Sequence, residues 1–147
     1  MKVIGKLLLL LVACTAKESF GGKISSCSKS SAKLQNIQME FEPDYPQAGD
    51  VITVYLDGTL TDTVTEGHLQ VELSHEKRPA PIKETFDLCY FLSLAKISCP
   101  LMSGKVHYRF RQSLPSTVIS GNYTFRGVAT QQNGQELFCL NAEFSIK

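Results

Sequence analysis

The sequence has no tryptophan and no apolar run long enough to span a bilayer, which takes about 20 residues in a helix. It also has no excess of charge, because 15 Lys and Arg residues face 14 Asp and Glu residues among 147. Proteins that bind nucleic acids normally carry a strong basic excess. We therefore expect no nucleic-acid partner.

The motifs that carry catalysis in many enzymes are also missing. There is no G-x-S-x-G elbow, no phosphate-binding P-loop and no G-x-G-x-x-G fingerprint. The pair His75-Glu76 continues as Lys77-Arg78-Pro79 and so does not complete H-E-x-x-H. We expect no catalytic residues, no cofactor and no enzyme activity, although a hydrolytic triad assembled from distant residues stays open as an alternative.

The N-terminus has the pattern of a secretory signal peptide. Lys2 and Lys6 precede the short apolar run Leu7–Ala13, and cleavage after Ala16 would leave small residues before the cut. We assign residues 1–16 to the signal peptide and predict secretion. The alternative is that Leu11–Cys14 is a bacterial lipobox, which would make Cys14 a lipid-modified N-terminus.

The remaining cysteines are Cys27, Cys89, Cys99 and Cys139. An even number in a secreted chain predicts two disulfides, because the compartment is oxidising. A zinc site is the alternative, but there is no C-x-x-C pair and the three histidines are not at ligand spacing. We expect no metal.

Strand-like patterns fill most of the chain after a loose N-terminal arm, residues 17–33. In residues 105–111 basic or histidine side chains alternate with apolar ones, which places one face in the interior and one in water. The Asn133-Gly134 pair is a strong hairpin signal. These features predict an all-β, immunoglobulin-like sandwich of two antiparallel sheets. The predicted strands are roughly 34–42, 50–60, 67–75, 105–112, 121–130 and 135–146.

Residues 76–100 break this regularity. They contain Pro79, Pro81, Pro100 and two cysteines. We expect one irregular strand around Phe86 and a loop held by a disulfide.

Two surface features accompany the strand from 105 to 112. Its wet face carries His107 and a basic row, Lys105, Arg109 and Arg111, for which a solvated outer face is the simple interpretation and docking on anionic membranes the alternative. Asn122-Tyr123-Thr124 is a glycosylation sequon whose Asn122 would point outward if Tyr123 points inward.

The C-terminal half carries a series of spaced elements that resembles a known family. The elements are Cys89, Cys99-Pro100-Leu101, Gly104-Lys105, Leu114-Pro115-Ser116, Gly121-Asn122-Tyr123, Gly134 and Leu137-Phe138-Cys139-Leu140. Over residues 27–147 the chain resembles the ML, or lipid-recognition, domain family. The pattern is most similar to its phosphatidylglycerol/phosphatidylinositol transfer proteins and more distantly to its secreted Niemann-Pick type C sterol carrier.

This resemblance implies a sandwich whose sheets splay apart around an internal apolar cavity. It implies a monomeric protein of the secreted or endolysosomal space that extracts phospholipid or sterol and transfers it between membranes, with transient contact to the membrane surface. It also implies the disulfide pairs Cys27–Cys139 and Cys89–Cys99. A lipid-dependent recognition module or an adhesion domain remains the alternative.

The resemblance further implies that the inward apolar side chains of the strands line the lipid site. From the residues alone an ordinary solid core is the favoured interpretation, because alternation indicates a buried face and not a cavity, and only the resemblance favours a lipid site. The implied lipid-binding residues are Ile52, Val54, Leu56, Leu69, Val71, Leu73, Phe86, Pro100, Leu101, Val106, Tyr108, Phe110, Tyr123 and Phe125.

Overall fold

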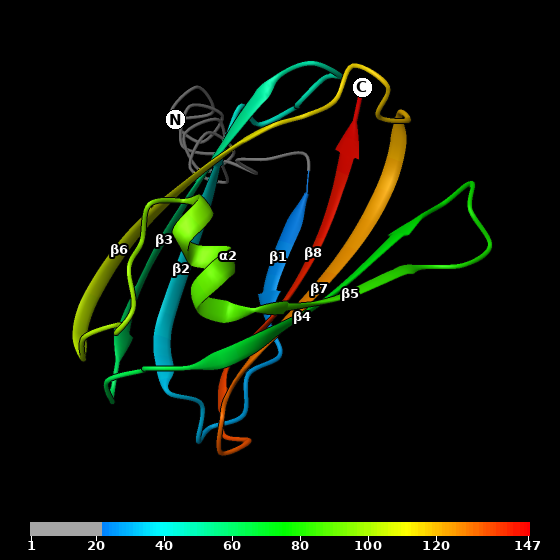
Figure 1. Ribbon diagram of the computed structural model, residues 1–147. Coiled ribbons are helices and arrows are strands. Elements are labelled where there is room, and N and C mark those ends of the chain that lie inside the picture. Colours follow the sequence, from blue (N-terminus) through cyan, green and yellow to red (C-terminus); the bar gives the residue numbers. More distant parts are fainter. Residues whose placement is uncertain (1–21) are drawn as a thin grey trace, which may run out of the picture.

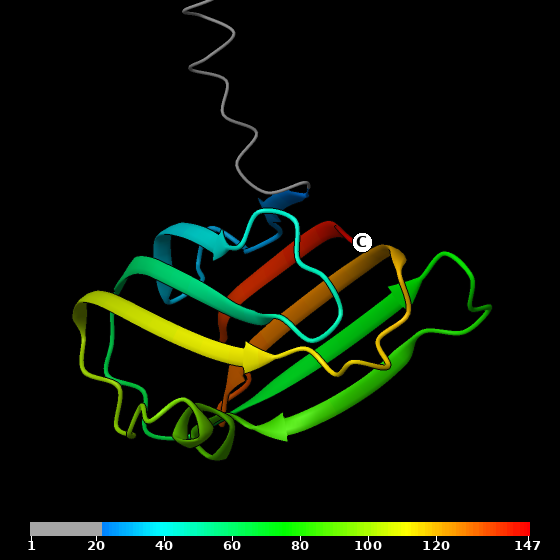
Figure 2. The ribbon, with the colours of Figure 1, turned by 90° about the horizontal axis from the view of Figure 1, so that it is seen from above.

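The computed structural model describes residues 22–147, which form two antiparallel sheets packed face to face (Figures 1 and 2). This architecture confirms the predicted all-β sandwich. The five-stranded sheet has the order β1 (Lys23–Ser26), β8 (Glu136–Ile146), β7 (Gly121–Gln131), β4 (Gly67–His75) and β5 (Ile82–Asp87). The three-stranded sheet has the order β2 (Leu34–Glu42), β3 (Val51–Leu60) and β6 (Gly104–Ser113).

The predicted strands form where alternation indicates them, within a residue or so at each end. The pairing of β3 with β6 shows the reason. Val54 lies opposite Phe110, and Leu56 opposite Tyr108, on the face toward the other sheet. The next residue of β3, Tyr55, lies opposite Arg109 on the outer face. Residues that alternate in the sequence therefore lie on alternate faces of the sheet.

The arm before Leu34 is more ordered than the sequence predicts. Lys23–Ser26 form strand β1, which pairs with β8 from Lys23↔Glu143 to Ser26↔Leu140. This corrects the expectation of a loose arm for those residues. Backbone hydrogen bonds to a sheet edge need no apolar side chains, so composition gave little sign of the strand. The predicted signal peptide, residues 1–16, lies outside the described residues.

A short helix, α2 (Leu88–Leu94), replaces the predicted loop after β5. The Asp87 carboxylate caps it by accepting a hydrogen bond from the Tyr90 backbone N–H at 2.8 Å. The predicted loop was wrong for these seven residues, because the helical spacing of Leu88, Phe91 and Leu92 covers little more than one turn and is too short to form a clear stripe. Within residues 22–147 no helix is long and apolar enough to cross a membrane.

The two sides of the sandwich close differently. Near β1, the Cys27–Cys139 disulfide joins the end of β1 to β8 within one sheet. The hydrogen bond from Lys33 N, just before β2, to Glu136 O of β8 at 3.1 Å links the two sheets. On the opposite side, β5 is the edge of one sheet and β6 the edge of the other. Helix α2 packs against β4 and β5 beside this gap (Figure 1). The described chain therefore has one strand-closed side and one side covered by a helix.

Candidate functional site

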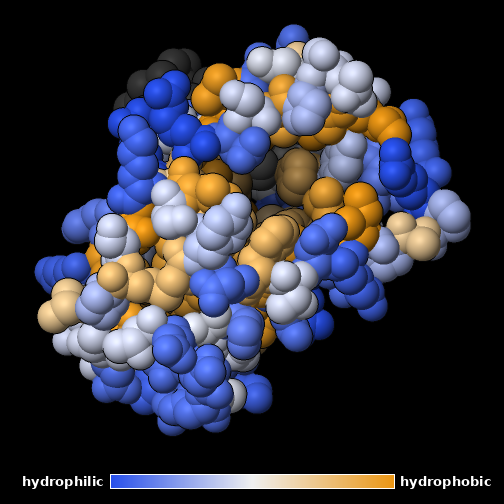
Figure 3. Space-filling view, viewed as in Figure 1, coloured by the Kyte–Doolittle hydropathy of each residue, from blue (hydrophilic) through white to orange (hydrophobic). Residues whose placement is uncertain are grey.

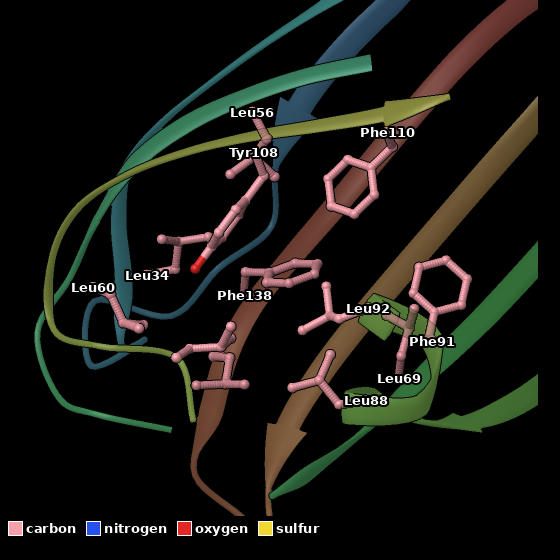
Figure 4. A pocket seen from close by; sticks show the side chains of 12 residues that line it. Leu34, Leu56, Leu60, Leu69, Leu88, Phe91, Leu92, Tyr108, Phe110 and Phe138 are labelled. Carbon is pink, nitrogen blue, oxygen red and sulfur yellow. The ribbon is translucent and has the colours of Figure 1, made fainter. Parts of the chain in front are cut away.

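An apolar cavity of about 70 Å³ lies between the sheets, at the end where α2 packs (Figure 4). Its walls come from both sheets and the helix. The lining residues are Leu34, Leu56, Leu60, Leu69, Leu88, Phe91, Leu92, Leu101, Tyr108, Phe110, Leu137 and Phe138.

Two local features aim side chains into this cavity. Opposite Ala129 and Thr130 of β7, strand β8 contains a bulge in which Leu137 is the extra residue. The bulge lets the consecutive residues Leu137 and Phe138 both line the cavity. Helix α2 contributes Leu88, Phe91 and Leu92, whose spacing of three and four residues places them on one helical face.

Tyr108 carries the one hydroxyl among the lining side chains, and Figure 4 shows its oxygen pointing between the sheets. Burial raises the pKa of this hydroxyl above its ordinary value, because the phenolate would lose hydration. The ring packs edge-on against Phe110 with centroids 6.4 Å apart. The cavity wall is therefore uncharged at neutral pH.

Toward the opposite end the inner faces become partly exposed. Ile52 and Val54 of β3 and Leu73 and Phe125 of the facing sheet are only half-buried, although their strand positions point between the sheets. Figure 3, viewed as in Figure 1, shows a hollow on the surface of the molecule with hydrophobic side chains along its rim. A solid sandwich core would bury these positions, so the sheets are not fully packed against each other here.

A second pocket of about 210 Å³ lies at this open end, between the β4–β5 loop and the β6–β7 loop. Buried His75 joins the two loops: its Nδ1 accepts a hydrogen bond from Lys77 N at 3.1 Å, and its Nε2 lies 3.1 Å from Ser120 O. Tyr123 donates its hydroxyl to Ile119 O at 2.6 Å. The pocket is lined by Leu73, Ser74, His75, Arg78, Ala80, Ile82, Thr117, Val118, Ile119 and Tyr123.

The structure divides the residues that the sequence implied for lipid binding. Those that line the cavity are Leu56, Leu69, Leu101, Tyr108 and Phe110, while Val71, Phe86 and Val106 pack into the same core. Leu73 and Tyr123 line the second pocket, and Ile52, Val54 and Phe125 lie outside both linings. Pro100 is exposed, because its neighbour Leu101 takes the inward position.

Seven cavity residues were not among those implied by the sequence. Leu60 ends a strand whose alternation already points it inward, so the pattern could have found it. Leu34 begins β2 out of step with Ile37, Met39 and Phe41 and lies inward only because of the irregularity between Gln35 and Gln38, which alternation does not predict. The spacing of Leu88, Phe91 and Leu92 after Asp87 is a short helical signal. Leu137 and Phe138 depend on the bulge, which no local pattern indicates.

The remaining site predictions fall as follows. Both disulfides, Cys27–Cys139 and Cys89–Cys99, have the predicted pairing. No group of three or more potential metal ligands occurs within residues 22–147. Asn122 is exposed, and its amide donates to Glu76 and accepts from Ser145. The basic row of β6 lies on the outer face of the three-stranded sheet.

Together, the fold and the site define a class: a disulfide-linked β-sandwich with an apolar interior that opens at one end. The ML domain family model matches residues 21–146, and the chain belongs to this family. A Dictyostelium discoideum relative, provisionally named as a phosphatidylglycerol/phosphatidylinositol transfer protein, is 29% identical over 95% of this chain and 97% of its own. The Aspergillus fumigatus phosphatidylglycerol/phosphatidylinositol transfer protein is 28% identical over 82% of this chain and 71% of its own.

Two solved structures share the fold. A Niemann-Pick type C2 protein from the Japanese carpenter ant superposes with a TM-score of 0.62 at 13% identity, covering 85% of this chain and 99% of that one. Chicken MD-1, solved with lipid IVa, also has a TM-score of 0.62, at 16% identity, and covers 86% of this chain and 90% of that one. At these identities the likeness concerns the fold.

Proposed function

We propose that this protein binds a lipid between its sheets and carries phospholipid, with phosphatidylglycerol and phosphatidylinositol as the first candidates, between membranes. The observation that carries the proposal is the set of half-buried apolar side chains on the inner faces at the open end. Exposing them to water is unfavourable by about 25 cal/mol per Å², and a hydrocarbon chain would cover them. The names of the relatives supply the choice of lipid.

The cavity volume sets a condition on this proposal. A cavity of about 70 Å³ is smaller than the roughly 150 Å³ that holds one benzene in an engineered protein core. A two-chain lipid with about 30 methylenes has on the order of 24 kcal/mol at stake on leaving a bilayer, so most of its hydrocarbon must be covered. The lipid must therefore occupy the open end as well as the cavity, and the sheets must separate further when it binds.

Lipid extraction tests the proposal directly. Protein secreted from its native source and purified without detergent should contain phospholipid that mass spectrometry identifies. The delipidated protein should then move labelled phosphatidylglycerol from donor to acceptor vesicles with no other protein present. Binding without transfer would favour the lipid-recognition module, and absence of both would favour the adhesion domain.

We further propose that the basic row of β6 provides transient contact with anionic membranes. Arg109 lies 5.8 Å from the centre of the Tyr55 ring, and His107 pairs with Asp57, so part of the row is engaged within the sheet. Lys105 and Arg111 have no carboxylate partner among the ion pairs of residues 22–147. A Lys or Arg near an anionic surface contributes about 1 kcal/mol.

Replacing Arg109 and Arg111 by Glu should therefore slow transfer from anionic vesicles and leave transfer from neutral vesicles unchanged. Transfer rates measured with the two vesicle types on the same protein preparation make the comparison. Equal rates of mutant and parent on anionic vesicles would contradict a docking role for the row.

The proposed setting is the secreted or endolysosomal space. The two disulfides are typical of an oxidising compartment. Exposed Asn122 of the sequon is also proposed to carry a glycan. A mass decrease after glycosidase treatment of protein secreted by a eukaryotic host would support glycosylation, and an unchanged mass would contradict it.

A further inference from the structure

Arg78 is the one permanently charged side chain that lines either of the two pockets described above. It lies in the loop between β4 and β5, where its backbone N–H donates to His75 O at 3.0 Å. The rest of the second pocket is largely apolar, with Ile82 and Ile119 exposed at 49% and 38%. A cation thus stands at the edge of an apolar surface that continues between the sheets.

The guanidinium of Arg78 has no carboxylate partner among the ion pairs formed by residues 22–147. The acidic side chain nearest in sequence, Glu76, is engaged elsewhere. Its two carboxylate oxygens accept hydrogen bonds from Asn122 N at 3.2 Å and from Asn122 Nδ2 at 3.0 Å. Glu76 is also absent from the pocket lining. Arg78 is therefore available for an anionic group from outside the chain.

The distance between the two pockets suits a lipid. Leu69 lines the cavity and Leu73 lines the second pocket, and both point inward from β4. Four residues of a strand span about 13 Å. One leaflet of a bilayer, half of a hydrocarbon core of about 30 Å, is about 15 Å deep. A lipid with its head at the second pocket would therefore place its chain ends in the cavity.

We propose that Arg78 binds the phosphate of the bound phospholipid and makes the site selective for anionic head groups. This inference rests on the proposed function. Arginine binds phosphate oxygens through a planar fork of N–H donors, and such charge-assisted hydrogen bonds are stronger than neutral ones. A choline head group brings its own cation to the phosphate, whereas a glycerol or inositol head group leaves the phosphate charge to Arg78.

An equilibrium competition tests the assignment. Delipidated protein is incubated with vesicles of equal phosphatidylglycerol and phosphatidylcholine content and re-isolated, and mass spectrometry gives the ratio of the two lipids bound. Membrane docking changes the loading and unloading rates together, so it does not alter this equilibrium ratio. The parent should be enriched in phosphatidylglycerol, and Arg78→Gln should lower the enrichment about tenfold or more.

Two further variants sharpen the test. Arg78→Lys keeps the charge but loses the fork, so its enrichment should fall between those of the parent and Arg78→Gln. Lys83→Gln is the matched control, because it removes the same charge from β5 at a side chain that is 69% exposed and pairs with Glu72. Its ratio should equal that of the parent. Thermal unfolding of each delipidated variant checks that the fold is retained.

The outcomes separate the inference from the function on which it rests. A parent that loads neither lipid overturns the proposed function and this inference with it. A parent that loads lipid but shows no enrichment, or an Arg78→Gln protein as enriched as the parent, overturns the Arg78 assignment alone. Inorganic phosphate, titrated against delipidated protein and followed by phosphorus NMR, should show no binding. Binding that depends on Arg78 would instead identify a free-phosphate site.

Discussion

At the scale of single residues, His75 holds the two loops of the open end in place. Its ring is buried, receives the Lys77 N–H at Nδ1 and approaches Ser120 O with Nε2. This pattern fixes the neutral tautomer with its proton on Nε2, because Nδ1 acts as an acceptor. The ring also packs edge-on against Tyr123, with centroids 4.5 Å apart.

Replacing His75 by Phe should separate these contributions. Phe retains a ring against Tyr123 but leaves Lys77 N and Ser120 O without their partner, so the free energy of unfolding should fall by about 1–3 kcal/mol. His75→Ala should lower the free energy of unfolding further, since it also removes the packing of the ring against Tyr123. Urea unfolding of delipidated protein measures both. His68→Ala, at an exposed position of the same strand, is the control and should change stability by less than about 0.5 kcal/mol.

Overpacking distinguishes the two ends of the interior. The closed end holds the cavity beside α2, and the open end holds the second pocket. Val106 is buried at 7% exposure and lies opposite Gly58. Val106→Phe should therefore destabilise the delipidated protein by about 1–3 kcal/mol. Val54 is half-buried at the open end, so Val54→Phe should cost less than about 1 kcal/mol and yet reduce lipid loading, because the ring occupies space meant for hydrocarbon.

Denaturant midpoints and bound-lipid stoichiometry, measured on the same two variants, check this contrast. Equal destabilisation by both substitutions would mean that the open end is packed as tightly as the closed end. That result would also remove the observation on which the lipid proposal stands.

At the scale of elements, α2 and its disulfide form a separable cover over the cavity. The helix has only seven residues, too few to be stable alone, and Cys89–Cys99 closes a loop with a sequence separation of 10 around it. Leu88 and Leu92 bury the helix against the core. Packing and cross-link together, rather than helix propensity, therefore keep the cover in place.

Changing both Cys89 and Cys99 to Ser should cost up to about 3 kcal/mol in the chain-entropy model. The loss should be local. Backbone hydrogen exchange should accelerate over residues 88–101, while β7 and β8 keep their protection relative to global unfolding. The same change at Cys27 and Cys139, which closes a far longer loop, should instead lower protection throughout the five-stranded sheet. Uniform acceleration in both double variants would contradict the picture of a local cover.

At the scale of the whole molecule, the sandwich is held along one side and free to open along the other. Near β1 the hydrogen bond from Lys33 N, just before β2, to Glu136 O of β8 joins the two sheets, whereas β5 and β6 are free edges and α2 packs beside them against β4 and β5. Lipid entry should therefore widen the gap between the two sheets along the β5 and β6 edges, with the β1 side acting as the hinge.

Because lipid binds the folded state, loading should raise apparent stability by mass action. A lipid at 100 times its dissociation constant adds about 2.7 kcal/mol. Calorimetry of loaded and delipidated protein should show a higher melting temperature for the loaded form. Val54→Phe should show a smaller increase than the parent, and an identical increase would place the lipid elsewhere.

The sequence by itself determined strands β2 to β8, their inner and outer faces away from the bulges, and the number of cysteines available for pairing. Alternation determines the inner and outer faces because a residue's side of a strand depends only on its position in the two-residue period. The basic row of β6 and the exposed Asn122 follow for the same reason.

Tertiary structure alone decided where the interior is hollow. Strand β1 exists because the edge of β8 pairs with it, α2 because the core and a disulfide hold it, and the inward pair Leu137 and Phe138 because of a bulge opposite β7. Alternation cannot tell whether the space between two apolar faces is filled. That depends on how far apart the sheets lie, and Val106 at the closed end and Val54 at the open end carry the same sequence signal in different surroundings.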